Sequence, residues 1–471
     1  MKKLIKIVLA AALPAVWAAG CSDFLKGGNL TTSPNNPVKG SASPSQLFVS
    51  IQTNNIVFQE SDMGRAIMQW TQQLYGAARQ QVGIYDYSGV DNSTYDGEFQ
   101  RPYGGGGLVD LRTLEANTLA NGDLMYVGVA QVMEAWMMGY TADVWGDVPY
   151  TQAVNYTTYP TPKLDPQQQV YDSVESLLSQ GITNMTAATA GGPGGADLVY
   201  GGLGFAGQKA AWIALAHTLK ARFYLHQAEK LGNAMYTSAL TEANLGISSN
   251  AGDYMAFHNG SLQLSSNTWW QFMATAGGTG RALDLVASTG ATNSTLWNML
   301  VAAADPRFAE YFNATNAADG EMRASRLSAG FPQPFVTYNE NQLIIAEANL
   351  AVGTGAAATT AYNNERAAWG TTRPWHSAIT LAPLVGTVTL QQVMTEKYIT
   401  LFQNTEVWND WKRTCFPALT VVPPGTSVFG GGKIPARMWY GATEQQTNPN
   451  IPAVGTAPNG NTNWNDPVRC P

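Results

Sequence analysis

The sequence predicts an all-α protein in which tetratricopeptide-like helix pairs form a scaffold that carries long irregular loops. Apolar residues recur at three- and four-residue spacing in several segments of roughly 15 to 25 residues, which is the pattern of amphipathic helices. Short turns join these segments in pairs, and stretches rich in Gly, Asn and Tyr separate the pairs. No sequence signature repeats at a fixed period, so the prediction of stacked pairs depends on helix lengths and turns.

The clearest helix is predicted from Asp123 to about Ala142. Its apolar residues follow the three-four spacing, and Gly146 and Pro149 cannot continue it. The first helix should begin at about Pro44, with Ser45 as its N-cap. By the same criterion we expect further helices at residues 61–79, 166–187, 205–229, 233–245, 340–351, 355–368 and 390–411.

Two long regions lack helical periodicity. Residues 82–109 are rich in Tyr, Gly, Asp and Asn and predict a long exposed loop, and residues 250–340 hold tryptophans among Gly and Asn. From Pro417 onward the chain is mostly coil. Residues 45–471 are therefore predicted to form a single helical domain with a loop-rich ligand-binding region and a coil-rich C-terminal segment.

The N-terminus has the pattern of a bacterial secretory signal. Three lysines precede an apolar stretch from about Ile7 to Ala19, which is too short and wrongly flanked for a membrane span. The small residues before Cys21 resemble a lipobox, so we expect a signal peptide at residues 1–20, acylation of Cys21 and a flexible tether at residues 21–44. The alternative is an ordinary signal peptide with an incidental cysteine. No later apolar run is long enough for a bilayer span, so anchoring without crossing is expected.

The charge of the chain excludes one class of partner. The chain carries 26 Lys and Arg against 33 Asp and Glu, a formal net charge of −7, and it has no basic run. Nucleic-acid-binding proteins need a basic patch to meet the phosphate backbone, so no nucleic acid partner is expected. Only 13% of the residues are charged, which suits an extracellular or envelope setting.

Apart from Cys21, the chain has two cysteines, Cys415 and Cys470. Outside the cytoplasm an even pair of cysteines predicts a disulfide. We therefore expect a Cys415–Cys470 bond that ties the coil-rich C-terminal tail to the body of the protein, with two unrelated thiols as the alternative.

Catalytic and metal-binding signals are scarce. The four histidines lack metal-ligand spacing, and no Gly-Lys-Ser or Gly-Lys-Thr follows the glycines at 104–107. Asp143 and Asp147 flank a Trp-Gly turn, where carboxylates usually accept hydrogen bonds within the turn. We therefore predict no catalytic residue, no metal site and no cofactor. One run of oxygen ligands is interpreted as a solvated turn, with a calcium site as the alternative: Asp86, Ser88, Asp91, Asn92, Asp96 and Glu98.

Aromatic residues in and beside the loops are the positive signal for ligand binding. Flat rings can stack on sugar faces or on apolar peptide side chains, and nearby Asn and Asp can bind hydroxyl or amide groups. The alternative is that the rings pack beneath the loops and hold them down. The predicted ligand-binding residues are Tyr75, Tyr85, Tyr87, Tyr95, Tyr103, Trp269, Trp270 and Trp297.

Several stretches resemble one family, the SusD/RagB-type nutrient-binding outer-membrane lipoproteins. They occur in the family's order along nearly the whole chain, and one departure is Gly441, which stands where the family usually has Pro. The matching stretches are residues 141–150 (TADVWGDVPY), 343–348 (LIIAEA), 362–367 (YNNERA), 396–398 (EKY), 406–413 (EVWNDWKR) and 434–437 (IPAR), followed by Tyr440, Glu444 and Asn448–Asn450.

The resemblance implies a SusD-like all-α scaffold on the outside of the outer membrane, held there by a lipid anchor. It also implies a protein that binds a nutrient and delivers it to a SusC-type TonB-dependent β-barrel without catalysis. The matching stretches do not locate the ligand, which is expected to be a glycan or an oligopeptide. The Trp269-Trp270 pair slightly favours a glycan.

Two other classes of protein remain as alternatives. An envelope glycoside hydrolase of helical fold would need two carboxylates roughly 5–10 Å apart across an aromatic cleft, and the sequence spacing shows no obvious pair. A periplasmic solute-binding protein would need two α/β lobes, but alternating strand–helix patterns are missing from the sequence.

Overall fold

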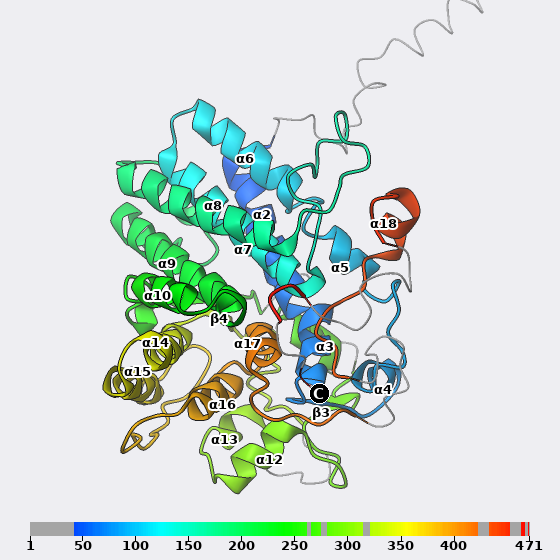
Figure 1. The fold of residues 1–471 in the computed structure, drawn as a ribbon, viewed down its shortest axis with the longest axis vertical. Coiled ribbons are helices and arrows are strands. Elements are labelled where there is room, and N and C mark those ends of the chain that lie inside the picture. Colours follow the sequence, from blue (N-terminus) through cyan, green and yellow to red (C-terminus); the bar gives the residue numbers. More distant parts are fainter. Residues whose placement is uncertain are drawn as a thin grey trace, which may run out of the picture.

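A computed structural model describes residues 42–260, 265–274, 280–313, 321–422, 433–452, 463–466 and 470. The predicted signal peptide, Cys21 and nearly all of the tether lie outside these residues. Helices make up most of the described chain, with two short two-stranded sheets beside them (Figure 1). The predicted all-α fold class is therefore confirmed. Within the described part of the chain, no helix is both long and apolar enough to cross a membrane.

The first helix, α2 (Pro44–Glu60), begins where the sequence predicts, but Ser43 rather than Ser45 is its N-cap. The Ser43 hydroxyl accepts a hydrogen bond from the Gln46 backbone N–H at 3.3 Å, and the Gln46 side chain accepts one from the Ser43 N–H at 2.9 Å. This reciprocal capping box leaves Pro44 at the first helical position, where its missing N–H costs nothing. Ser45 instead lies 3.3 Å from the hydroxyl of Tyr126.

Helix α7 (Leu124–Trp145) forms the centre of the N-terminal half, and every residue from Met125 to Trp145 is buried. It contacts α2, α6 (Leu108–Ala120), α8 (Gln167–Ala187) and α9 (Phe205–Leu231). Gly146 ends the helix with φ of 76°, a conformation that favours glycine. The central helix is thus covered on several sides at once.

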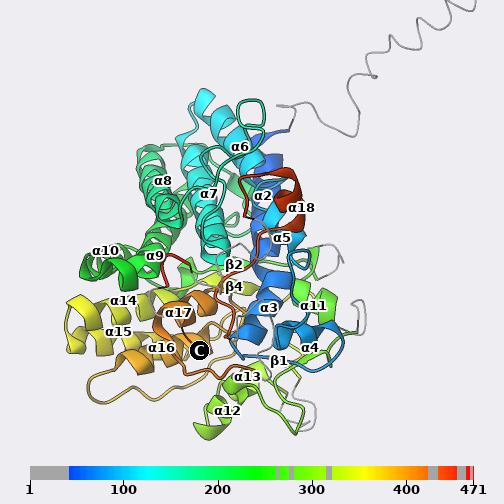
Figure 2. The ribbon, with the colours of Figure 1, turned by 45° about the vertical axis from the view of Figure 1, so that its right-hand side comes forward.

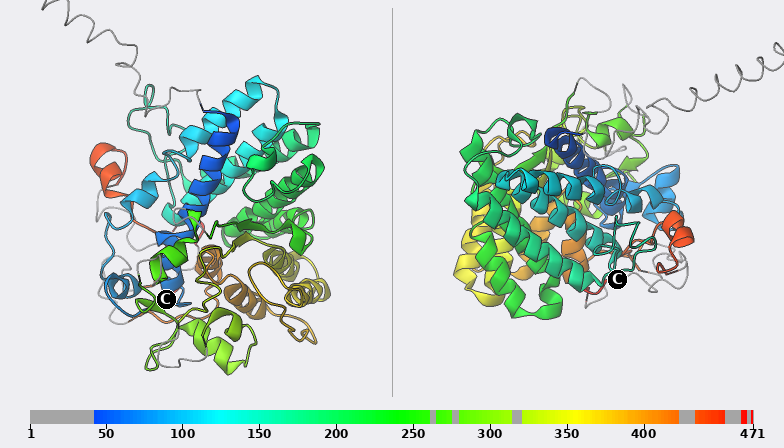
Figure 3. Two further views of the ribbon diagram at one scale, coloured as in Figure 1. Left: turned by 180° about the vertical axis from the view of Figure 1, so that it is seen from behind. Right: turned by 90° about the horizontal axis from the view of Figure 1, so that it is seen from above.

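The scaffold is a stack of antiparallel helix pairs, seen along the left side of Figure 1 and from above in Figure 3. The α7–α8 pair is close because Gly128 and Gly181 face each other: a Cβ on Gly128 would lie 2.7 Å from the Gly181 carbonyl oxygen. This stacking is the tetratricopeptide-like arrangement expected from the sequence. The later members of the stack are α9–α10 (Asn233–Ala243), α14 (Tyr338–Val352)–α15 (Gly355–Ala368), α16 (Leu390–Thr400) and α17 (Glu406–Thr414).

Two predicted helices are wrong in length. The helix predicted at residues 61–79 ends at residue 70, shortly before Gln72 takes a left-handed conformation with φ of 55°. The helix predicted at 390–411 is broken between α16 and α17, where Gln403 has φ of 67°. The Gln403 carbonyl oxygen accepts a hydrogen bond from Gln333 Nε2 at 2.8 Å. Tertiary hydrogen bonds thus stabilise a break that no Gly or Pro announces.

The prediction of a long exposed loop at residues 82–109 is also wrong. Tyr87 and Phe99 are each 1% exposed, and two short helices interrupt the segment. Two small antiparallel sheets were not predicted.

The remaining elements are short. They are the helices α3 (Asp62–Trp70), α4 (Gln80–Tyr85), α5 (Asp96–Gln100), α11 (Thr268–Met273), α12 (Thr295–Ala302), α13 (Phe308–Tyr311) and α18 (Ala442–Thr447), and the 3₁₀ helices Gly194–Ala196 and Asn250–Gly252. In the two sheets, strand β1 (Tyr75–Gly76) pairs with β3 (Leu285–Val286), and β2 (Tyr254–Ala256) pairs with β4 (Gln333–Val336).

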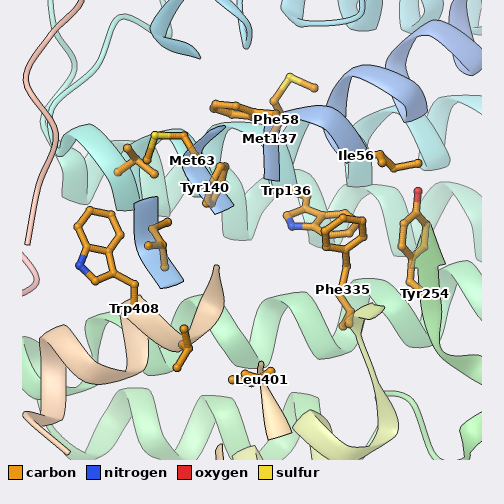
Figure 4. Close-up of a cluster of buried hydrophobic side chains, with 14 of the residues drawn as sticks. Ile56, Phe58, Met63, Trp136, Met137, Tyr140, Tyr254, Phe335, Leu401 and Trp408 are labelled. Atoms are coloured by element: carbon orange, nitrogen blue, oxygen red, sulfur yellow. The ribbon is translucent and has the colours of Figure 1, made fainter. Parts of the chain in front are cut away.

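An aromatic core joins the N-terminal helices to the C-terminal half (Figure 4). Phe58 of α2 meets Tyr140 of α7 edge-to-face, with ring centroids 4.8 Å apart. Trp136 of α7 meets Tyr254 of β2 at 5.0 Å and Phe335 of β4 at 6.2 Å. Such pairs add about 0.5–1.5 kcal/mol each to the free energy of unfolding beyond the area they bury. The N-terminal helices and the β2–β4 sheet therefore share one core, and separate apolar clusters lie between α9, α10 and α14 and between α14, α15 and α16.

Buried ion pairs connect the helices at the centre of the scaffold. His226 of α9 lies between two carboxylates: Nδ1 is 2.9 Å from Asp143 Oδ1, and Nε2 is 2.6 Å from Glu406 Oε1. Burial lowers the pKa of His226, but Asp143 and Glu406 outweigh it and raise the pKa to about 9. Beside it, Arg222 pairs with Glu340 at 2.7 Å. The imidazolium therefore ties α7, α9 and α17 together.

A second buried cluster links α14, α16 and α17. Lys397 Nζ lies 3.0 Å from Glu347 Oε2 and 3.0 Å from Asp410 Oδ1, and Arg413 reaches the same two carboxylates. These four residues belong to the stretches that carry the family resemblance, as do Asp143 and Glu406. These six residues of the resemblance therefore lie in the charged interior of the scaffold.

The end of the chain is tied to this interior. Cys415 and Cys470 form a disulfide, with their Cα atoms 5.4 Å apart. Upstream of Cys470, Asn463 Nδ2 donates to the Asp143 carbonyl oxygen at 2.9 Å, and Asn465 Nδ2 donates to the His226 carbonyl oxygen at 3.0 Å. The described part of the tail thus supplies hydrogen-bond donors to α7 and α9.

Candidate functional site

The candidate ligand site is a hollow of about 430 Å³ on the edge of the molecule that holds α4 and β1 (Figure 2). Three segments that are far apart in the sequence build it: residues 72–86, Thr292 and residues 420–422. We name it the Tyr75 hollow. Its lining residues are Gln72, Tyr75, Gly76, Val82, Tyr85, Asp86, Thr292, Thr420, Val421 and Val422.

Two predicted ligand-binding residues, Tyr75 and Tyr85, meet in this hollow. Tyr75 lies in β1 opposite Val286 of β3, and Tyr85 is the last residue of α4. Both side chains are half-buried, and their rings pack edge-to-face with centroids 4.6 Å apart. Burial, and to a lesser extent Tyr75, raises the pKa of Tyr85 to about 12. The phenol of Tyr85 therefore stays protonated at neutral pH and can donate a hydrogen bond.

The floor of the Tyr75 hollow is held by Gln72 and Gly76. Gln72 Oε1 accepts a hydrogen bond from the Thr295 hydroxyl at 2.8 Å, and its Nε2 donates to the Thr420 carbonyl oxygen. The Gln72 side chain thus joins β1's side of the wall to α12 and to residues 420–422. A Cβ on Gly76 would lie 2.1 Å from the Gln81 carbonyl oxygen, so only glycine lets β1 run this close to α4.

Helix α4 is fixed from both sides, which positions the Tyr85 ring. Arg79 Nη1 lies 3.1 Å and 3.0 Å from the two carboxylate oxygens of Asp284, next to β3. From below, the buried Trp70 indole donates to the Ile84 carbonyl oxygen at 3.0 Å. The two tyrosine rings are therefore held in place before a ligand arrives, which lowers the entropy cost of binding.

The lining suits a neutral ligand that has an apolar face and hydroxyl or amide groups. The rings and valines offer apolar surface, and the threonines and Gln72 add neutral polar groups. Among the described lining residues Asp86 is the one carboxylate, and its Oδ1 already accepts from the Ser88 hydroxyl at 2.6 Å. Hydrolysis of a glycosidic bond uses two carboxylates roughly 5–10 Å apart. The described lining thus offers groups for binding and holds a single carboxylate.

The structure buries four of the aromatic residues that were predicted to bind the ligand. Tyr87 is 1% exposed, Tyr95 7%, Trp269 0% and Trp297 9%. Their segments fold inward, as the edge-to-face contact of Trp297 with Phe308 at 4.6 Å shows. Composition could not separate these rings from Tyr75 and Tyr85, because both groups lie in segments of the same character.

The last two predicted residues lie elsewhere on the molecule. Trp270, on α11, is half-buried, and its backbone N–H donates to the Asn267 side chain at 3.2 Å. It does not line the Tyr75 hollow. Tyr103 is also half-buried and lines a different hollow.

This second hollow has a volume of about 400 Å³ and lies between α5, the segment 149–162 and α18. We name it the Tyr156 hollow. Sequence analysis missed two of its rings, Tyr156 and Tyr159, although they stand in a run of Thr and Pro that turn chemistry would place at the surface. Its walls are mostly aromatic and proline side chains: Phe99, Tyr103, Tyr156, Tyr159, Pro160 and Pro162.

The run of oxygen ligands at residues 86–98 is used within the protein. Asp91 Oδ1 accepts hydrogen bonds from the backbone and hydroxyl groups of Ser93 and Thr94, and Glu98 pairs with Arg101 at 2.9 Å. Over the described ranges, no group of three or more His, Cys, Asp or Glu residues is arranged to hold a metal ion.

Comparisons with known proteins agree with this fold. A family described as "Starch-binding associating with outer membrane", the SusD-like family, matches residues 34–441. A SusD/RagB family protein from Bacteroides thetaiotaomicron has a TM-score of 0.66 at 20% identity, with 87% of this chain and 95% of that chain covered.

Two further solved structures show the same fold. A SusD homologue from Bacteroides fragilis has a TM-score of 0.71 at 15% identity, covering 90% of this chain and 100% of that chain. A chitin-binding SusD homologue from Flavobacterium johnsoniae has a TM-score of 0.68 at 16% identity, covering 92% of this chain and 100% of that chain. No curated protein matches the chain. Because the family match covers most of its length, the chain belongs to the SusD-like family.

Proposed function

We propose that this protein is a lipid-anchored outer-membrane lipoprotein that binds a glycan in the Tyr75 hollow and delivers it intact to a SusC-type TonB-dependent barrel. The observation that carries the binding proposal is the pair of fixed, half-buried rings of Tyr75 and Tyr85 beside neutral polar groups. A sugar offers both a C–H face for such rings and hydroxyls for the polar groups.

A glycan is favoured over an oligopeptide by the chemistry of the hollow and by the family. The lining has one carboxylate and no Lys or Arg among the described lining residues, so it offers little to the charged termini and side chains of a peptide. The family is described as starch-binding, and one solved relative is a chitin-binding homologue. An oligopeptide ligand is the second outcome that the binding experiment can give.

The same residues support binding without cleavage. Asp86 is the single carboxylate of the described Tyr75 lining, and Glu444 is the single carboxylate of the described Tyr156 lining. Among the described lining residues, neither hollow has the two carboxylates that glycoside hydrolysis uses. Two buried carboxylates of the scaffold, Glu406 and Glu347, are engaged in ion pairs in the interior.

The N-terminal sequence supports the proposed lipid anchor, and the family supports the proposed transporter partner. The lipobox-like residues before Cys21 would place two or more acyl chains on that cysteine, and two chains hold a protein stably on a bilayer. The family is described as associating with the outer membrane. A surface protein of this kind needs a transporter to move the captured ligand inward, and a SusC-type barrel is the partner that the resemblance implies.

Calorimetry of the soluble chain beginning at Ser22 tests the binding proposal. The panel contains malto-oligosaccharides, chito-oligosaccharides and oligopeptides, and each mixture is analysed afterwards for products. We expect saturable binding of one glycan series, recovery of the ligand intact, and a loss of at least about tenfold in affinity in Tyr75→Ala and Tyr85→Ala, since a stacked ring contributes on the order of 1–3 kcal/mol.

The matched control is Phe257→Ala, which removes an aromatic ring that is 47% exposed and lines neither hollow. Cleaved glycan in the mixtures would show that the protein is a hydrolase. Binding of peptides alone would replace the glycan as the ligand. Glycan binding that is equally strong in both tyrosine variants would move the site away from the Tyr75 hollow.

A further inference from the structure

The Tyr156 hollow has the features of a binding site that the proposed function does not use. Its two outer rings are unusually open: Tyr156 is 82% exposed and Tyr159 is 40% exposed. Burial of apolar surface contributes about 25 cal/mol for each Å² that is removed from water. The exposed rings do not gain this free energy in the protein alone, and they would gain it by packing against a ligand.

The segment that carries these rings is held in one conformation by hydrogen bonds. The Asn155 carbonyl oxygen accepts from the Tyr159 N–H at 2.7 Å. From the C-terminal side, Asn448 Nδ2 donates to the Pro162 carbonyl oxygen and Asn450 Nδ2 to the Thr161 carbonyl oxygen, each at 2.8 Å. The open rings therefore stand on a fixed support and form a preorganised surface.

The charge of the hollow points to a neutral ligand. Glu444 is the one ionisable carboxylate in the described lining, and its Oε1 already accepts from Asn448 Nδ2 at 2.8 Å. Tyr103 contributes a third ring, and its enclosed hydroxyl has no hydrogen-bond partner among the described residues. Aromatic walls with hydroxyl tips and little charge suit the apolar face of a sugar ring.

The Tyr156 and Tyr75 hollows lie on the same edge of the molecule. Helices α5 and α18 stand above α4 along the right side of Figures 1 and 2, and the view from behind in Figure 3 shows the same order along its left side. Residues 86–95 run between the two hollows and are bound to α18, since Ala442 N–H donates to the Asn92 carbonyl oxygen at 3.0 Å and Asn92 Nδ2 to Gln445 Oε1 at 2.8 Å.

We propose that the Tyr156 hollow is a second binding site for the glycan chain held in the Tyr75 hollow, so that long chains occupy both sites and short ones only the first. The proposal rests on the proposed function, because it takes the same neutral polymer as ligand. A protein loop is the other occupant that an aromatic and proline surface can take. The shared edge and the scarcity of charge favour the glycan.

Chain-length dependence of affinity tests this proposal. Two sites joined by one ligand convert the second contact into an intramolecular one, which can raise affinity on the order of 10²–10⁴-fold. The probes are maltotriose, maltoheptaose and soluble amylose, and chitotriose, chitohexaose and glycol chitin. We expect the wild-type protein to bind one polymer molecule at least about tenfold more tightly than the trimer. In Tyr156→Ala/Tyr159→Ala the affinity for the polymer should lie within about threefold of the affinity for the trimer.

The two substitutions leave the folded state in place, because both rings are exposed, and Phe257→Ala again serves as the matched control. The second site is supported if the double variant binds the trimer with unchanged affinity and its affinity no longer rises with chain length. Length dependence that survives the double substitution, or is missing from the wild-type chain, overturns it while leaving the proposed function intact. Failure of every glycan to bind would instead refute the proposed function itself.

A second arm separates the two hollows directly. In Tyr75→Ala/Tyr85→Ala, residual binding of the polymer is expected, because the Tyr156 hollow remains, and adding Tyr156→Ala/Tyr159→Ala should remove it. Residual binding that persists in the fourfold variant would place the second contact elsewhere on the protein.

Discussion

The buried imidazolium of His226 makes the stability of the fold depend on pH. Burial lowers the pKa of His226, but Asp143 and Glu406 raise it to about 9 from an ordinary value of 6.5. The folded chain therefore holds a proton that the unfolded chain releases between pH 6.5 and 9. Its contribution to the free energy of unfolding is complete below pH 6.5 and is lost as pH rises through 9. A shift of about two and a half pH units corresponds to about 3 kcal/mol.

Urea unfolding at pH 6.5 and pH 9.5 measures this loss in the wild-type chain, His226→Gln and the control His217→Gln. We expect the wild-type chain and the control to lose about 3 kcal/mol more between the two pH values than His226→Gln loses. At pH 6.5 the variant should be less stable than the wild-type chain by about 3–5 kcal/mol, because two buried carboxylates lose their cation. His217 lies closer to the surface, with 15% of its side chain exposed.

Equal pH dependence in all three chains would refute the reasoning. If His226→Gln does not fold, NMR titration of the wild-type histidine rings gives the same answer. One imidazole should titrate near pH 9, and titration of every histidine below pH 7 would show that the Asp143–His226–Glu406 arrangement does not hold a proton.

Two further predictions concern the scaffold. The Cys415–Cys470 disulfide closes a loop of 55 residues, so Cys415→Ser/Cys470→Ser should lower the free energy of unfolding by up to about 4 kcal/mol in urea titrations, and an unchanged midpoint would contradict this. Gly128→Ala places a Cβ 2.7 Å from the Gly181 carbonyl oxygen and should cost about 1–3 kcal/mol in thermal unfolding. Gly105→Ala, where a Cβ meets nothing within 4 Å, is the control, and equal stability of the two variants would refute the close packing of α7 on α8.

The ends of a helix were predictable where residues close in the sequence determine them. Helix α7 begins after Asp123 and ends at Gly146, and both signals are visible in the sequence because capping and left-handed glycine act locally. The break at Gln403 could not be predicted, because hydrogen bonds from residues 70 or more positions away stabilise it. The Ser43 cap depended on Gln46, whose role as a capping-box partner could have been read from the spacing.

The site was predictable only in part, for a similar reason. Tyr75 and Tyr87 stand in similar surroundings in the sequence, yet one is half-buried beside a hollow and the other is 1% exposed. What separates them is the path of the chain around α4, which depends on contacts with β3 and with residues 420–422. Tyr156 could have been found, because a tyrosine within a short run of threonines and prolines is a surface signal.

The hydrogen bonds of Asn463 and Asn465 set the order in which this fold can be finished. The Asp143 carbonyl oxygen, at the carboxyl end of the central helix, takes donors from Asn463 and from Lys412, both made long after it. A buried carbonyl without its donors costs about 1–3 kcal/mol, so α7 gains stability when Lys412 and Asn463 are in place. The early helices therefore complete their packing only after residues 412 and 463 have been added to the chain.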